Sequence, residues 1–131
     1  MSVMTVNGLT EQLPQLAATT DIVPCDNADP CDAMALSLRA HPLSGMLHAA
    51  GVGDVGLLTQ LDDSRLRWMY APKAIGAHCF HVATACQPVE SQILFSSVGS
   101  GLANVGQANY AAGNACLDAH AHSHRVDALA S

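Results

Sequence analysis

Three short apolar runs, each bounded by glycine, proline or polar residues, are the clearest pattern along the chain. They cover residues 21–25, 45–50 and 92–97. Runs of this length between turn-forming residues are typical of β-strands. Pro24 cannot donate a hydrogen bond to a neighbouring strand, so the first run is expected at a sheet edge or a strand end. The pattern therefore predicts three strands.

Helical segments are predicted between and after these runs. Pro30 is favourable in a first helical turn, and His41-Pro42 ends the helix that it begins. Asp62 to Ser64 offer caps for a second helix. Pro72 and Gly76 interrupt the helical pattern before the third, and the Ala-rich last segment suits a long helix. The predicted helices cover residues 30–40, 62–68, 77–85 and 107–125.

Strands and helices thus alternate three times along the chain. This order predicts an α/β fold with a parallel sheet. Ligands bind such sheets at the carboxyl ends of the strands. Residues that carry function are therefore expected just after Cys25, Ala50 and Ser97.

Composition narrows the class of protein. Half of the 131 residues are hydrophobic and 12% are charged, which suits a buried core of one domain or less and argues against disorder. The net charge of −6 disfavours nucleic acid as a partner. No apolar stretch approaches the roughly 20 residues that span a bilayer, and the opening residues lack a secretory pattern. Five cysteines without a C-x-x-C pair indicate a reducing compartment, so a cytoplasmic protein is predicted.

A tyrosine, a serine and a lysine are candidates for acid–base chemistry. Tyr110 and Asn114 lie four residues apart on the last predicted helix and share a face. Ser96 and Ser97 end the strand before it, and Lys73 lies upstream. An ammonium beside a phenol lowers its pKa, which would let the phenol donate a proton to a carbonyl. The alternative is a helix tyrosine whose polar tip lies at the surface.

A glycine pattern after the second predicted strand resembles a dinucleotide fingerprint. Gly51-Val-Gly-Asp-Val-Gly56 matches G-x-G-x-x-G. That fingerprint also needs a helix that opens at once and an acidic residue about 20 positions later, at the end of the next strand. Residues 70–76 contain neither a strand nor an acid. The run is therefore not interpreted as a pyrophosphate loop.

Histidines cluster near the end of the chain. His120 and His124 share a face of the last predicted helix and form a weak metal-binding pair, with His122 between them. The sequence places no third ligand beside them, and His78 and His81 do no better. Solvated helix histidines are the favoured interpretation, so no metal is predicted, although a metal-binding module is kept as a distinct hypothesis.

Four strings decide between these interpretations, because together they resemble the ketoreductase domains of modular polyketide synthases. Those domains belong to the short-chain dehydrogenase/reductase superfamily. The likeness is continuous from about residue 21 to residue 125 and is weakest over residues 1–20. The strings, in chain order, are His48-Ala-Ala-Gly51, Ala71-Pro-Lys73, Leu94-Phe-Ser-Ser97 and Gly106-Gln-Ala-Asn-Tyr-Ala-Ala112.

The resemblance implies a role for each of four residues. Tyr110 matches the family's proton donor, and Ser97 matches the serine that hydrogen-bonds the substrate carbonyl. Lys73 matches the lysine that lowers the pKa of the tyrosine and contacts the cofactor. Asn114 matches the asparagine that completes the tetrad. A lysine upstream of the tyrosine, with asparagine four residues after it, is the arrangement of polyketide and animal fatty-acid ketoreductases.

The cofactor implied is NADPH. Asp26 matches the contact to the adenine, and Ala49, Ala50 and Gly51 would line the cofactor together with Lys73 and Tyr110. The reaction implied is hydride transfer to the β-carbon of a β-ketoacyl thioester, which gives a β-hydroxyacyl group on an acyl carrier protein. Such an enzyme serves polyketide or fatty-acid biosynthesis.

The chain also departs from the family pattern. Residues 1–20 match neither the family's glycine-rich loop nor its basic residues for the 2′-phosphate. The resemblance therefore implies a partial Rossmann-like domain over residues 1–131, a three-layer α/β/α fold that lacks the N-terminal nucleotide-binding βαβ unit and the C-terminal strands and lid.

Two sequence motifs that mark product configuration in the family do not assign it here. Gly53-Asp54-Val55 stands where one stereochemical class has Leu-Asp-Asp, and Leu94 stands where the opposite class has tryptophan. The remaining synthase segments are expected partners. A non-catalytic remnant or interaction fragment that cannot bind NADPH is the alternative to a working reductase.

Overall fold

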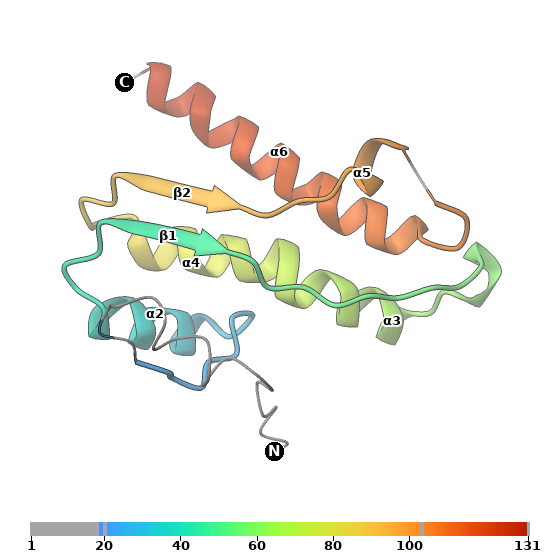
Figure 1. Cartoon of the computed structure of the whole chain (residues 1–131), viewed down its shortest axis with the longest axis horizontal. Coiled ribbons are helices and arrows are strands. Elements are labelled where there is room, and N and C mark those ends of the chain that lie inside the picture. Colours follow the sequence, from blue (N-terminus) through green and yellow to red (C-terminus); the bar gives the residue numbers. More distant parts are fainter. Residues whose placement is uncertain (1–18, 20, 103, 131) are drawn as a thin grey trace.

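Two parallel strands organise the fold in this computed structural model, which describes residues 19, 21–102 and 104–130. Strand β1 (Gly45–His48) pairs with β2 (Ser91–Leu94), with Gly45 opposite Ser91 and His48 opposite Leu94. Figure 1 shows the two arrows side by side, with the helical connection running beneath them. The parallel pairing confirms the predicted α/β class. Both strands end earlier than the apolar runs that predicted them.

The predicted strand over residues 21–25 is wrong. The described residues of that segment are irregular and lead into a turn before the first labelled helix. A strand exists only through hydrogen bonds to a neighbour. The sheet of the described residues contains β1 and β2, and neither of them pairs with this segment.

Helix α2 (Pro30–Arg39) forms where it was predicted. The Asp29 carboxylate caps it by accepting hydrogen bonds from the backbone N–H groups of Cys31 and Asp32. The helix packs on α4 (Gly76–Thr84), and Ala33 meets Cys79, Ala83 and the edge of Phe80 in the main apolar cluster. Small side chains at this contact let the two helices approach closely.

Helix α3 (Asp63–Tyr70) continues without a break into α4 through the π-helical segment η3 (Ala71–Ile75). The interruption expected at Pro72 and Gly76 is therefore a wider helical turn and not a break. The wide turn leaves the Pro72 carbonyl free, and it accepts a hydrogen bond of 2.7 Å from the Asn27 side-chain amide. A Cβ at position 76 would collide with that amide, so glycine is needed there.

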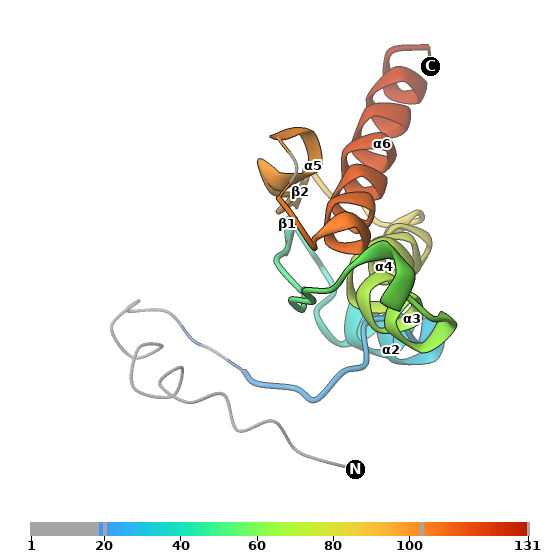
Figure 2. The same ribbon diagram turned by 90° about the vertical axis from the view of Figure 1, so that its right-hand side faces the viewer.

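Helices α2, α3 and α4 lie to one side of the strands (Figure 2). After β2 come the short helix α5 (Gly99–Leu102) and the long helix α6 (Ala108–Ala130), which packs on α3 and η3. A short 3-10 turn, η2 (Leu58–Gln60), precedes α3. Side chains at alternate strand positions face away from the helices: Leu47 is 68% exposed and Ile93 48%. None of the helices described is long and apolar enough to cross a membrane.

Candidate active site

Lys73, Asn114 and Tyr110 meet where η3 packs against α6. The Lys73 ammonium donates a hydrogen bond of 2.9 Å to the Asn114 side-chain oxygen. The Asn114 side-chain amide in turn donates to the Tyr110 backbone carbonyl at 2.9 Å, which closes the i, i+4 pair along α6. The Lys73 nitrogen also lies 5.1 Å from the centre of the Tyr110 ring. Asn114 thus fixes a lysine that is distant in sequence beside the tyrosine.

This arrangement is largely enclosed. Lys73 is 5% exposed and Asn114 is fully buried. The lysine reaches the tyrosine past Gly51, where a Cβ would stand only 3.0 Å from the Lys73 nitrogen. A side chain at position 51 would therefore push the ammonium away, which explains why glycine follows the two alanines after β1.

Ser97 lies in the loop after β2 and hydrogen-bonds Tyr110. Its hydroxyl oxygen accepts a hydrogen bond of 3.1 Å from the Gly99 backbone N–H, which leaves the hydroxyl proton available for donation. A Cβ placed on Gly99 would lie 3.4 Å from the Ser97 oxygen and 3.6 Å from the Tyr110 ring. The pKa of Tyr110 is lowered, chiefly by hydrogen bonding from Ser97, with Asn114 and the Lys73 charge adding to it.

A pocket of about 440 Å³ opens at the carboxyl ends of the two strands. This is the edge at which parallel sheets bind ligands. Small residues form one wall, while polar groups and Phe95 form the other. The lining residues are Ala49, Ala50, Gly51, Val52, Gly53, Lys73, Phe95, Ser96 and Tyr110.

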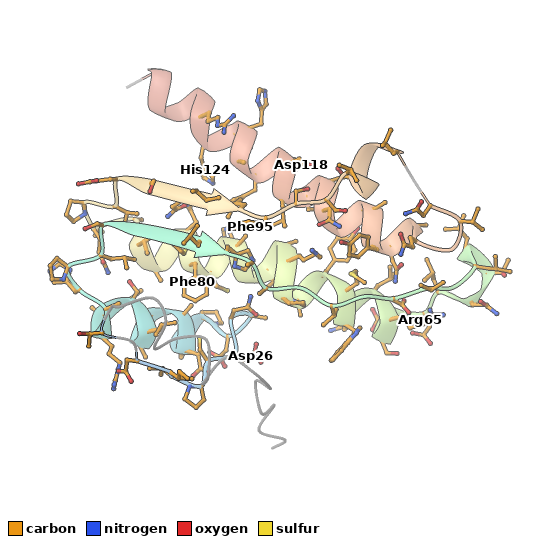
Figure 3. The ribbon with its side chains drawn as sticks, in the orientation of Figure 1. Asp26, Arg65, Phe80, Phe95, Asp118 and His124 are labelled. Atoms are coloured by element: carbon orange, nitrogen blue, oxygen red, sulfur yellow. The ribbon has the colours of Figure 1, made fainter. Side chains whose placement is uncertain are left out.

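Three predicted site residues do not line the pocket. Ser97 and Asn114 are linked to it through their hydrogen bonds with Tyr110 and Lys73, whereas Asp26 lies apart. The Asp26 carboxylate accepts a hydrogen bond from the Ala28 backbone N–H, and its own N–H donates to Asp32. These contacts form a turn that leads into α2. The residue is exposed and lies on the far side of β1 from α6 (Figure 3).

The ketoreductase-domain family model matches residues 2–131. The chain belongs to the ketoreductase-domain family. This confirms the resemblance to polyketide-synthase ketoreductases within the short-chain dehydrogenase/reductase superfamily. The match agrees with the geometry described above, in which a tyrosine, a serine, a lysine and an asparagine lie together near the carboxyl ends of the strands.

Two curated relatives illustrate the similarity of this ketoreductase-family chain to large synthases. It is 44% identical over 124 residues to the spectinabilin polyketide synthase system protein NorB of Streptomyces orinoci, a match that covers 92% of the chain and 6% of the relative. It is 43% identical over 129 residues to polyketide synthase GfsA of Streptomyces halstedii, covering 93% and 2%. The chain therefore spans only a few per cent of the length of these relatives.

Solved structures agree. A structure of A-type ketoreductases from a modular polyketide synthase is 32% identical with a TM-score of 0.84, and the match covers 93% of the chain and 27% of that structure. The first-module ketoreductase of phoslactomycin biosynthesis from Streptomyces sp. HK803 is also 32% identical, with a TM-score of 0.83 and coverage of 93% and 30%. The arrangement of strands and helices is thus shared with ketoreductases.

An ion pair that the sequence did not reveal anchors the start of α6 in this ketoreductase-family chain. Arg65 on α3 (Figure 3) binds the Asp54 carboxylate through two nitrogens, at 2.6 and 3.0 Å. Asn109 donates to the same carboxylate at 2.5 Å. The Arg65 hydrogen bond is the main cause that lowers the pKa of Asp54. Because Asn109 immediately precedes Tyr110, this network helps to set where the tyrosine stands.

The glycine run that contains Asp54 does not build a phosphate loop here. It leads into the short 3-10 turn η2 and not into a long helix. The Gly56 backbone N–H donates to the Gly106 carbonyl at 2.8 Å, and Gly106 has a φ of 76°, which favours glycine. The run therefore joins the loop after β1 to the loop before α6.

The histidines differ from the sequence interpretation. His81 of α4 stands beside His120 and His124 of α6 and supplies the third side chain that the sequence did not place. The Nε2 atom of His120 is buried and lacks a hydrogen-bond partner. The residue is half-buried, so its Nε2 atom is shielded from solvent while part of the ring remains exposed.

Proposed function

We propose that the chain supplies the catalytic residues of an NADPH-dependent reductase that converts a β-ketoacyl thioester into a β-hydroxyacyl thioester in polyketide assembly. The observation that carries the proposal is the meeting of Lys73, Asn114, Tyr110 and Ser97 through hydrogen bonds, beside a pocket that Lys73 and Tyr110 line. These residues come from η3, α6 and the loop after β2, so closeness in sequence does not explain their meeting. Membership of the ketoreductase-domain family supports the same chemistry.

Ser97 and Tyr110 would act on the ketone oxygen. The Ser97 hydroxyl, whose oxygen is already held by the Gly99 N–H, donates a hydrogen bond and polarises the carbonyl. The Tyr110 phenol then gives its proton to the oxygen as negative charge develops there. A lowered pKa makes that proton easier to release. The Lys73 charge stabilises the tyrosinate that remains, and Asn114 keeps the lysine in place.

The pocket suits a nicotinamide cofactor. Ala49, Ala50 and Gly51 form a low wall along which a flat ring and its ribose fit, and a Cβ on Gly51 would crowd the Lys73 ammonium. Lys73 would donate hydrogen bonds to the ribose hydroxyls. NADPH, when bound, supplies the hydride that reaches the β-carbon. Asp26 remains the proposed contact to the adenine.

The proposed partners follow from the size of the relatives. The chain matches a small share of multidomain synthases, so we infer that other segments of a ketoreductase or synthase accompany it. The substrate would arrive as a thioester on an acyl carrier protein. The prediction of a partial domain over residues 1–131 belongs to the same proposal.

A second candidate function is a non-catalytic segment that docks onto another part of a synthase. The outward face of the sheet favours it, because Leu47, Ile93 and Phe95 are about half or more exposed. Apolar side chains gathered on a sheet face are typical of a surface that another element covers.

A chimera separates the two candidates. Residues 21–125 would replace the matching segment of the phoslactomycin first-module ketoreductase, and NADPH consumption would be measured with a small β-ketoacyl thioester. We expect activity in the chimera and a loss of roughly 100- to 10,000-fold after Tyr110→Phe, because the proton donor is removed while the ring remains. Tyr70→Phe is the matched control, since Tyr70 lies on α3 outside the pocket, and it should leave the rate unchanged.

Two results would count against the reductase. If Tyr110→Phe and Tyr70→Phe are equally active, Tyr110 is not the proton donor. If the chimera folds and binds NADPH but reduces nothing, the non-catalytic candidate gains support.

A further inference from the structure

Three histidines from two helices come together at the end of α6 that is remote from the candidate active site. His120 and His124 lie one turn apart on α6, and His81 faces them from α4. Ring centroids are 3.7 Å apart for His81 and His124, 4.3 Å for His120 and His124, and 5.5 Å for His81 and His120. One nitrogen of each ring lies within 4.8 Å of the others.

This spacing is close to what a shared metal ion needs. Zinc binds imidazole nitrogens at about 2.0–2.1 Å in a tetrahedron, which puts two ligand nitrogens about 3.4 Å apart. The rings of His81 and His124 are stacked, with 26° between their planes, so one of them must turn for both to point a nitrogen at the same ion. An i, i+4 pair of histidines on one helix face is a recurrent half of a zinc site, and His81 supplies the third ligand from across the gap.

The state of the rings also suits metal binding. Burial lowers the pKa of His81 and of His120, and the neighbouring His124 lowers both further. Neutral imidazole is the form that binds metals. The Nε2 atom of His120 is buried without a hydrogen-bond partner. Such an atom is costly when it binds nothing, and a metal ion would satisfy it.

The surroundings leave room for the ion and a water molecule. A pocket of about 440 Å³ opens between β2 and α6, lined by His120 and His124 together with Glu90, Gln92 and Arg125 among others. Figure 3 shows His124 on the side of α6 that faces β2. The Glu90 carboxylate adds negative charge near the opening, and Gln92 hydrogen-bonds His81, which would orient its ring.

We propose that His81, His120 and His124 form a binding site for a divalent transition-metal ion of the zinc type, with water as the fourth ligand, that links α4 to α6. The site stands apart from the proposed ketone reduction and does not depend on it. The position of the site would let the ion hold two helices together. Helix α4 continues the segment that carries Lys73, and α6 carries Tyr110 and Asn114, so the ion would join the two helical elements that supply these residues.

The test is a titration of the full chain, freed of any affinity tag, with Co²⁺. The visible absorption of bound Co²⁺ reports coordination by nitrogen ligands, and Zn²⁺ should displace the Co²⁺ ion. We expect a one-to-one complex. His124→Ala or His120→Ala should weaken Co²⁺ binding at least about tenfold. His122→Ala is the matched control, because His122 lies on the same helix but is exposed and outside the cluster, and it should bind as the unaltered chain does.

A measurement on the unaltered chain guards against variants that fail to fold, which circular dichroism would reveal. Zn²⁺ should protect His81, His120 and His124 from chemical acylation while His122 and His41 remain reactive. Absence of Co²⁺ binding at about millimolar concentration would overturn the site. So would equal weakening by His122→Ala, or acylation of all five histidines regardless of zinc.

Discussion

Lys73 combines a positive charge with almost complete burial. Moving an ammonium out of water is expensive unless polar groups receive it. In the described structure the Asn114 oxygen accepts one of its hydrogen bonds, and the Tyr110 ring lies within reach of its field. Burying Lys73 fixes the position of its ammonium at a cost to the stability of the folded chain. A lysine at the surface would cost less but could not hold its charge at one side of the phenol.

The two tyrosines of the chain should titrate apart. Burial raises the pKa of Tyr70, whereas hydrogen bonding from Ser97 lowers that of Tyr110. Because a phenol with a lowered pKa loses its proton at lower pH, tyrosinate absorbance should rise in two steps, with Tyr110 first. Tyr110→Phe should remove the first step and Tyr70→Phe the second. Ser97→Ala should move the first step toward the ordinary value near 10.

The same shift sets the pH dependence of the proposed reduction. The reaction needs the protonated phenol, so the rate should fall as pH rises through the pKa of Tyr110. A single titration step for both tyrosines would contradict this assignment. So would a first step that Ser97→Ala leaves in place.

Residue by residue, the sequence predicted the tetrad only through four strings taken together. Spacing alone placed Tyr110 and Asn114 on one helix face, but nothing periodic connects them to Lys73. The ion pair of Asp54 and Arg65 escaped prediction for the same reason. It joins two segments through side chains, and such contacts leave no pattern in the hydrophobic positions.

Among the elements, local signals predicted the bounds of the long helices well, but they predicted two strands correctly and a third, over residues 21–25, that does not form. Caps such as Asp62 and the proline at the start of α2 act within a few residues, so the helices appear close to their predicted bounds. A strand depends on a neighbour that is remote in sequence. The run over residues 21–25 has strand-like composition, yet it pairs with neither β1 nor β2.

His81 on α4 and His120 on α6 should make the stability of the folded chain fall in mild acid. The pKa values of His81 and His120 are lowered in the folded chain, whereas unfolding returns them to about 6.5. As pH falls through about 6.5, the unfolded state therefore takes up protons first, and stability is lost toward the folded-state values. In chelator-treated protein we expect the melting temperature to fall by about 3–6 °C between about pH 7.5 and pH 5.

Glutamine variants identify the source of that effect. His120→Gln cannot take up a proton, so it should flatten the pH dependence of the melting temperature, whereas His122→Gln should not. The titratable or charged groups near His120 are His78, His81, His124 and Arg125, with the Glu90 carboxylate at the opening of the same pocket. An equal response in the two variants would show that other groups cause the acid sensitivity.

At the scale of the whole molecule, the sheet leaves strand edges and an apolar face exposed to solvent. Each described strand has one neighbour, so β1 and β2 both present a free edge, and Leu47, Ile93 and Phe95 lie open on the outward face. Open edges promote pairing with other chains, and a sheet of two strands is marginal alone. We expect the isolated chain to self-associate, as measured by size-exclusion chromatography with light scattering.

A charge on that face tests the cause. Ile93→Lys should shift the population toward monomer, because a lysine on an exposed strand opposes edge-to-edge pairing. Val82→Lys on the exposed side of α4 is the control and should leave association unchanged. A single monomeric species in the unaltered chain, with one sharp cooperative melt, would contradict the prediction.

The wide turn of η3 makes chain length as important as residue identity. An α-helix advances about 100° per residue, and π-turns inside α-helices recur at functional sites. Deleting Ala74 would rotate α3 against α4 by about that angle and carry Lys73 away from Asn114, with every motif residue still present. A ketoreductase segment of this kind can therefore lose the position of its lysine while the residues at all its motif positions stay the same.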